Sequence, residues 1–397
     1  MTLVRRSFPA MFRDIAVVSA LYFIAGKAGL AVPYTSGNVS PVWPAAGVAV
    51  AALVIRGYCV WPGIAIGAFL VNFFSPIPHL AAFGIGAGNV LGPLLIAWLL
   101  GRCTKGRLTH LADLGWLIAC TLPGTLLSAV TGNIALMLTG VRAWQSAPAA
   151  GLVWWMGDSL GVLLITPLLL RAADLRLSKT RAAELAALLV ALVLFAALLF
   201  SGQHVTEEVL GFAVLPFIIW GAVRFGIAGA ALASCTVSSV AIWATSHSSG
   251  PFVHYRAALY DAGLLQAFIA TISISGLSLA AVISERYATQ QALAREEELR
   301  RAEEALRRSD RLAALGRLAA TISHEVNNPL AACVNLVHLI GRKALDNETR
   351  EFIALLEQEL LRVAAITKRT LGFVRESSER VQSSIPTLLD ETLTLYE

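Results

Sequence analysis

The sequence has few charged residues for its length. Asp, Glu, Lys and Arg make up 14% of its 397 residues, and 56% of the residues are hydrophobic, whereas soluble domains carry about 25% charged residues. The deficit is confined to residues 14–284, which form nearly continuous apolar segments, while residues 285–397 are rich in Arg and Glu. This excludes an ordinary soluble protein and predicts a membrane domain followed by a soluble helical module.

The sequence also lacks paired cysteines and clustered metal ligands. The five cysteines are scattered (Cys59, Cys103, Cys120, Cys235 and Cys333), so we expect neither a disulfide framework nor a zinc site. The histidines His204, His247 and His254 do not have the spacing of a metal site. The net charge of +5 comes largely from basic residues in short loops beside the apolar segments, and we expect no nucleic-acid partner.

The apolar region divides into segments that approach the length of membrane spans, about 20 residues. The first follows Arg13 and continues past Lys27, so we expect an uncleaved span rather than a signal peptide. Some segments are short, and we therefore predict eight to ten spans in an all-α, polytopic helical bundle. The candidate segments are 14–32, 43–56, 60–77, 80–101, 114–138, 149–170, 184–201, 209–224, 227–246 and 262–284.

The loops between these segments differ in charge. If the N-terminus is cytoplasmic, the outer loops hold only Arg142 and Arg256. This charge difference follows the positive-inside rule, and ten spans, an even number, then place both termini in the cytoplasm. We expect a multi-pass protein of a bacterial inner membrane. The inner loops hold the remaining basic residues: Arg56, Arg102, Lys105, Arg107, Arg171, Arg176, Lys179, Arg181 and Arg224.

Several polar residues interrupt the apolar segments. An unpaired charge in the bilayer costs about 2.5–3.5 kcal/mol, so we expect Lys27 and Asp158 to face the bundle interior, with Asp158 paired to Lys27 or to Arg224. One interpretation is a polar cluster that senses an unknown small-molecule or membrane signal; the other is hydrogen bonding between helices without a ligand. The candidate cluster is Lys27, Asn72, Asn89, Asn133, Asp158 and Arg224.

The charged part of the chain has a helical apolar pattern. The three-four spacing of a coiled-coil seam recurs at Leu299, Ala302 and Leu306 and again, in a shifted register, at Leu312, Leu315, Ala319, Ile322 and Val326. A second stripe runs through Phe352, Leu356, Leu360, Val363, Thr367, Thr370 and Val374, after a turn predicted at 343–348. Two such hairpins would form a dimeric four-helix bundle.

The candidate reactive residues lie in one run, Ser323-His324-Glu325-Val326-Asn327-Asn328-Pro329-Leu330. His324 is offset from the seam and should face solvent, where its unprotonated nitrogen can act as a nucleophile. Glu325 can accept the other ring proton, and Asn328 lies one helical turn away. Pro329 removes a backbone N–H and should kink the helix.

Two resemblances follow from these motifs. Residues 311–376 resemble the dimerisation and histidine-phosphotransfer (HisKA) domain of sensor histidine kinases, which implies His324 as phosphoacceptor, Glu325 as base and Asn328 as a phosphate or nucleotide contact. The segments Ser40–Gly47, Trp61–Ala65 and Trp154–Gly161, with Pro216–Trp220 and Arg224–Gly226, resemble the first class of membrane-associated sensor (MASE) domains. That family comprises input domains of bacterial signalling proteins.

The expected domain order is therefore a cytoplasmic N-terminus (1–13), a sensor domain (14–284), a coiled-coil linker (285–310), a phosphotransfer domain (311–376) and the truncated start of an ATP-binding domain (377–397). The resemblance implies a homodimeric kinase that uses ATP and Mg²⁺ and passes phosphate to a response regulator. With only this start of an ATP-binding domain, the 397-residue chain should accept phosphate but bind no cofactor. A transporter with a signalling tail and a phosphotransfer or phosphatase module remain alternatives.

Overall fold

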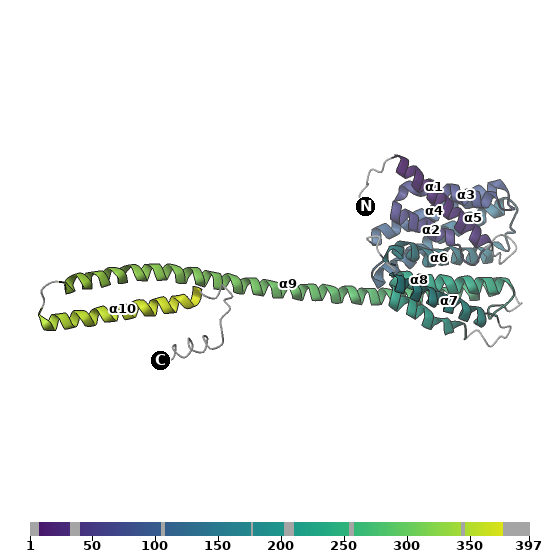
Figure 1. The fold of residues 1–397 in the computed structure, drawn as a ribbon. Coiled ribbons are helices and arrows are strands. Elements are labelled where there is room, and N and C mark those ends of the chain that lie inside the picture. The colour runs from purple at the N-terminus through teal and green to yellow at the C-terminus, as the bar shows by residue number, and fades with distance from the viewer. Residues whose placement is uncertain are drawn as a thin grey trace. The chain divides into compact units, whose positions relative to one another are not determined.

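The computed structural model describes residues 8–31, 40–104, 108–175, 178–201, 210–253, 258–342 and 346–375. Within these ranges the regular structure is helical throughout, as predicted (Figure 1). The chain forms two compact units, Met1–Gln290 and Gln291–Glu397. His204, His254 and the expected start of an ATP-binding domain lie outside the described residues.

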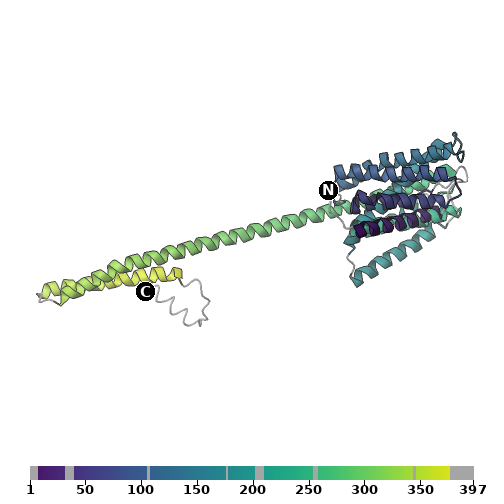
Figure 2. The same ribbon diagram turned by 90° about the horizontal axis from the view of Figure 1, so that it is seen from above.

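The first unit is a bundle of apolar helices that lie alongside one another (Figures 1 and 2). Pro44 and Pro62 stand in the first turns of α2 and α3, where a missing N–H costs nothing. The helices are α1 (Phe8–Leu30), α2 (Pro44–Arg56), α3 (Trp61–Phe73), α4 (His79–Cys103), α5 (Leu111–Leu138), α6 (Ala147–Arg171), α7 (Lys179–Leu199), α8 (Leu215–Ser246) and the beginning of α9 (Ala258–Gly341), with 3-10 turns at Tyr58–Val60, Ala172–Asp174 and Leu210–Val214.

All ten expected apolar segments fall largely within these helices, but they differ in length. By length and composition, seven helices among the described residues can cross a membrane: α1 and α4 to α9. The helices α2 and α3 have 13 residues each, shorter than the roughly 20 that a perpendicular span needs. The ten expected segments and the seven long helices also differ because α8 contains two of the expected segments.

A backbone break at Gly226 divides α8. Its φ of 64° and ψ of −150° are not helical, and only glycine adopts such values without strain. A Cβ atom on Gly229 would overlap the carbonyl oxygen of Gly221, although residues eight apart in a straight helix are separated by about 12 Å. The chain therefore doubles back at Gly226, between the segments 209–224 and 227–246 that the sequence separated.

The outward surface of the first unit is apolar. On α7, Val190, Leu194 and Leu198 are 58%, 66% and 75% exposed, while Leu188 and Leu192 face the core. A broad apolar surface of this kind is unfavourable in water and suits contact with lipid, where helices satisfy their own backbone hydrogen bonds. The surface therefore agrees with a multi-pass membrane domain.

The second unit is a helical hairpin made by the remainder of α9 and by α10 (Asn347–Arg375) (Figures 1 and 2). A Cβ on Gly341 would lie 3.6 Å from the Ile353 side chain, and His338 Nδ1 lies 3.9 Å from Glu357 Oε1. Of the turn predicted at 343–348, residues 343–345 lie outside the described residues, and Asn347 and Glu348 already belong to α10. The backbone of α9 stays helical through the register shift after Leu306 and through Pro329.

Candidate functional site

His324 lies on α9 with its side chain exposed, as the sequence predicted. Glu325 and Asn328 are also exposed, and Asn328, four residues along the helix, shares a face with the histidine. The neighbouring Asn327 is half-buried, and its side-chain amide donates a hydrogen bond to the Ser323 hydroxyl over 3.3 Å. The imidazole is therefore accessible to a phosphoryl donor, with a carboxylate and an amide beside it.

The apolar stripe around His324 divides into two faces. Ala319 is 9% exposed and Val326 is half-buried, so these residues belong to the interior of the hairpin. Leu312, Leu315 and Ile322 remain 64%, 58% and 49% exposed. Within one chain α10 therefore covers only part of the stripe that the sequence predicted as a seam. The uncovered leucines and isoleucine suit burial against a second copy.

Three residues of the predicted polar cluster come together in the membrane domain. Asn72, Asn89 and Asp158, which are 8%, 3% and 1% exposed, line one cavity of about 40 Å³. They belong to α3, α4 and α6, and two tryptophans, Trp43 and Trp154, line the same cavity. The other lining residues are Leu30, Ser40, Ile77, Ile85 and Leu136.

Ser128 on α5 connects two members of this cluster. Its hydroxyl oxygen lies 2.7 Å from Asp158 Oδ2 and 3.1 Å from Asn89 Oδ1. The other carboxylate oxygen, Asp158 Oδ1, is buried and has no hydrogen-bond partner among the described residues. Ser128 gives no signal in the sequence, because a serine in an apolar helix usually bonds its own backbone.

The other three predicted residues have different partners, and both predicted ion pairs of Asp158 are wrong. Arg224 forms a two-pronged pair with Glu184 of α7, at 2.6 and 2.7 Å. The Lys27 ammonium approaches the Phe74 carbonyl at 3.5 Å. These partners arise because α7 packs on α8, and α1 on α3.

Asn133, the last of the six, lies at the end of α5. Its side-chain oxygen accepts a hydrogen bond of 2.6 Å from Arg142 in the following loop. Partial burial lowers the pKa of the Arg142 guanidinium, which nevertheless remains protonated in proteins. Asn133 therefore holds the α5–α6 loop and does not line the cavity beside Asp158.

Gln266 links the cavity wall to α9. Its side chain is fully buried, and its amide donates to the carbonyl oxygens of Pro41 and Val153, each at 2.9 Å. These two carbonyls adjoin Ser40 and Trp154 of the cavity. Gln266 was recognisable in the sequence, because it is a lone amide in the apolar segment 262–284, the same feature that marked the asparagines.

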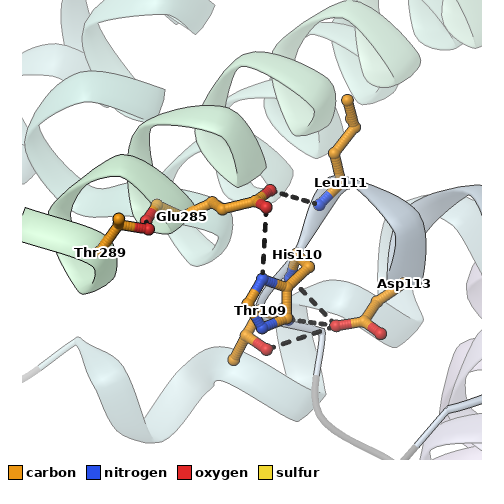
Figure 3. Close-up of polar contacts among 6 residues, drawn as sticks. All are labelled: Thr109, His110, Leu111, Asp113, Glu285 and Thr289. Carbon is orange, nitrogen blue, oxygen red and sulfur yellow. Dashed lines mark hydrogen bonds and ion pairs between the residues drawn. The ribbon is translucent and has the colours of Figure 1, made fainter. Parts of the chain in front are cut away.

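A second polar contact involves α9 near the last apolar turn (Figure 3). The Glu285 carboxylate lies 3.7 Å from His110 Nδ1 and accepts a hydrogen bond of 3.4 Å from the Leu111 amide. Asp113 fixes the same turn by accepting bonds from the Thr109 and His110 amides at 2.9 and 3.0 Å. The start of α5 is thereby tied to α9 just before the charged linker.

Of the three histidines considered for a metal site, only His247 lies in the part of the chain that the structure describes. Among the described residues no three His, Cys, Asp or Glu side chains lie close enough to hold a metal ion. His247 Nδ1 lies 2.8 Å from the Trp243 carbonyl oxygen. All five cysteines are free.

Comparison with known families decides the identity of both units. The MASE1 family matches residues 15–287, and the His Kinase A (phospho-acceptor) domain matches residues 314–379. The chain belongs to the MASE1 family. With both domains in one chain, the protein is a membrane sensor histidine kinase. No curated protein and no solved structure matches the sequence.

The two matches divide the polar sites of this sensor kinase. His324, Glu325 and Asn328 lie within the phosphoacceptor match, whereas the Asp158 cavity, Gln266 and Glu285 lie within the MASE1 match. The exposed histidine therefore belongs to the output domain, and the buried polar cavity belongs to the input domain.

Proposed function

We propose that this sensor kinase is phosphorylated on His324 by ATP and passes the phosphoryl group to an aspartate of a response regulator. The observation that carries the proposal is the exposure of His324 on a helical hairpin, with Glu325 and Asn328 exposed beside it, inside a phosphoacceptor domain match. A buried or ion-paired histidine could not meet a nucleotide.

The chemistry follows from these side chains. The unprotonated ring nitrogen of His324 attacks the terminal phosphorus of ATP, the bond to the bridging oxygen breaks, and ADP leaves. Glu325 accepts the proton from the other ring nitrogen, which keeps the attacking nitrogen electron-rich. Asn328 is placed to donate a hydrogen bond to the phosphoryl group. The nitrogen–phosphorus bond then breaks as an aspartate of the response regulator attacks.

Dimerisation and orientation complete the proposal. A second copy would bury the exposed Leu312, Leu315 and Ile322 in a four-helix bundle. The basic inner loops favour an inner-membrane protein with both termini in the cytoplasm, where ATP and Mg²⁺ are available. A signal received in the membrane domain would then control the phosphorylation of His324 through α9.

The test measures phosphate on His324. The chain in detergent is mixed with an isolated histidine-kinase ATP-binding domain, Mg²⁺ and labelled ATP, and acid-labile, base-stable label is counted. His324→Ala should abolish the label. Glu325→Gln should slow labelling by about 10² to 10⁴-fold, the usual contribution of a general base.

His338→Ala is the matched control, because His338 lies on the same helix and is 64% exposed, yet contacts Glu357. Its label should equal that of the unaltered chain. Undiminished label in His324→Ala would refute the assignment. If nothing is labelled by ATP, phosphoramidate supplies phosphate without an ATP-binding domain, and the same pair of variants gives the answer.

A further inference from the structure

The cavity beside Asp158 is lined by a buried carboxylate and by two side-chain amides, those of Asn72 and Asn89. Ser128 carries one hydroxyl hydrogen, yet its oxygen lies within hydrogen-bond distance of both Asp158 Oδ2 and Asn89 Oδ1. Asp158 Oδ1 has no hydrogen-bond partner among the described residues. A buried acceptor without a donor is costly, so Asp158 Oδ1 favours an electropositive partner in the cavity.

The ionised form of Asp158 also has no countercharge among the described residues. No basic side chain among the described residues forms an ion pair with it, because Arg224 binds Glu184 and Lys27 approaches the Phe74 carbonyl. The carboxylate is 1% exposed, and burying an unpaired charge is strongly unfavourable. Water in the cavity could donate to Oδ1, but it would leave the charge in place.

The size and composition of the cavity restrict what could supply that charge. A volume of about 40 Å³ holds a few waters, since one water needs about 10–15 Å³ on this measure. A metabolite of ordinary size is excluded. Divalent ions prefer several carboxylate ligands, and Asp158 is the one acidic residue in the lining of this cavity among the described residues.

We propose that the Asp158 cavity is a binding site for one small monovalent cation, of the class of sodium, potassium and ammonium. Asp158 Oδ1 balances its charge, the side-chain oxygens of Asn89 and Asn72 complete its coordination, and Ser128 orients the carboxylate by donating to Oδ2. The site is distinct from His324 and does not depend on its phosphorylation.

The test is thermal unfolding of the full chain in detergent. Sodium, potassium or ammonium chloride is titrated at constant ionic strength against the chloride of N-methylglucamine, a cation too large for the cavity. A ligand that binds only the folded state raises the melting temperature saturably. At least one of the three ions should do so, and their order of effect identifies the preferred ion.

Two variants locate the effect. Asp158→Asn keeps the shape of the side chain but removes its charge, and it should lose the saturable rise. Glu184→Gln is the matched control, because that carboxylate is ion-paired outside the cavity, and it should keep the rise. Ser128→Ala should weaken the apparent affinity about tenfold or more, as is typical when a residue that orients a metal ligand is removed.

A second measurement does not require Asp158→Asn to fold. Radioactive sodium or rubidium should bind the unaltered chain at one ion per chain and be displaced by the ion that gave the largest thermal shift. The proposal is overturned if no ion binds saturably, if the melting temperature follows ionic strength whatever the cation, or if a folded Asp158→Asn variant keeps the rise.

Discussion

Gly161→Ala tests how closely α2 and α6 are packed. The two helices touch backbone to backbone: a Cβ on Gly161 would overlap the Trp43 carbonyl oxygen, and one on Gly47 would overlap the Gly161 carbonyl oxygen. At Gly157 the same interface leaves only 2.7 Å between such a Cβ and the Ser40 carbonyl oxygen. Since carbon–oxygen contacts normally lie at about 3.3–3.6 Å, a methyl group at Gly161 must push α2 away.

The cost can be worked out from the contacts that the displacement disturbs. Overpacking a tight interior costs about 1–3 kcal/mol. The shift also strains two hydrogen bonds, from the Trp43 amide to the Gly157 carbonyl at 2.9 Å and from the Thr166 hydroxyl to the Gly47 carbonyl at 3.1 Å. Such bonds are worth about 0.6 kcal/mol each in membrane proteins. Alanine regains up to about 1 kcal/mol of helix propensity.

The net loss should therefore be about 1–3 kcal/mol, measured as a lowered melting temperature in detergent. Gly101→Ala and Gly115→Ala are matched controls, because both glycines lie in helices with no atom within 4 Å of an added Cβ. They should melt at or slightly above the temperature of the unaltered chain. A Gly161→Ala variant that melts with these controls would refute the close-packing argument.

Two further predictions concern hydrogen bonds near the starts of α9 and α10. Gln266→Leu should lower the free energy of unfolding by about 1 kcal/mol, because two hydrogen bonds at about 0.6 kcal/mol each disappear. Gln290 is exposed, so Gln290→Leu should melt at the temperature of the unaltered chain. Equal melting temperatures of the two variants would contradict this. Asp346 precedes α10, and hydrogen bonds from the Thr349 side chain and, over 2.7 Å, from the Thr349 amide lower the pKa of its carboxyl group. Its contribution to stability is present above the ordinary aspartate pKa and disappears as pH falls through the lowered value. At about pH 6 the amides of residues 349–351 should exchange hydrogen more slowly than in Asp346→Ala, and at about pH 3 or below the difference should shrink; a constant difference would count against the cap.

The sequence by itself determined the features that depend on local pattern. Hydropathy located the ten apolar segments, and the three-four spacing placed α9 and α10, because helical periodicity repeats within a few residues. The break between the two arms of α8 was also readable, since Arg224 and Gly226 interrupt the apolar run. His324 was identified from its immediate neighbours and found exposed.

Only the tertiary structure decided which distant polar groups meet. Arg224 and Asp158 looked like partners in the sequence, but the packing of α7 on α8 brings Glu184 to Arg224. Asp158 instead meets Ser128 and Asn89, which no local signal distinguishes from other serines and asparagines in apolar helices. The physical reason is that hydropathy fixes that a helix is buried, whereas its rotation and neighbours, and hence its side-chain partners, are set by close contacts such as Gly161 against Trp43.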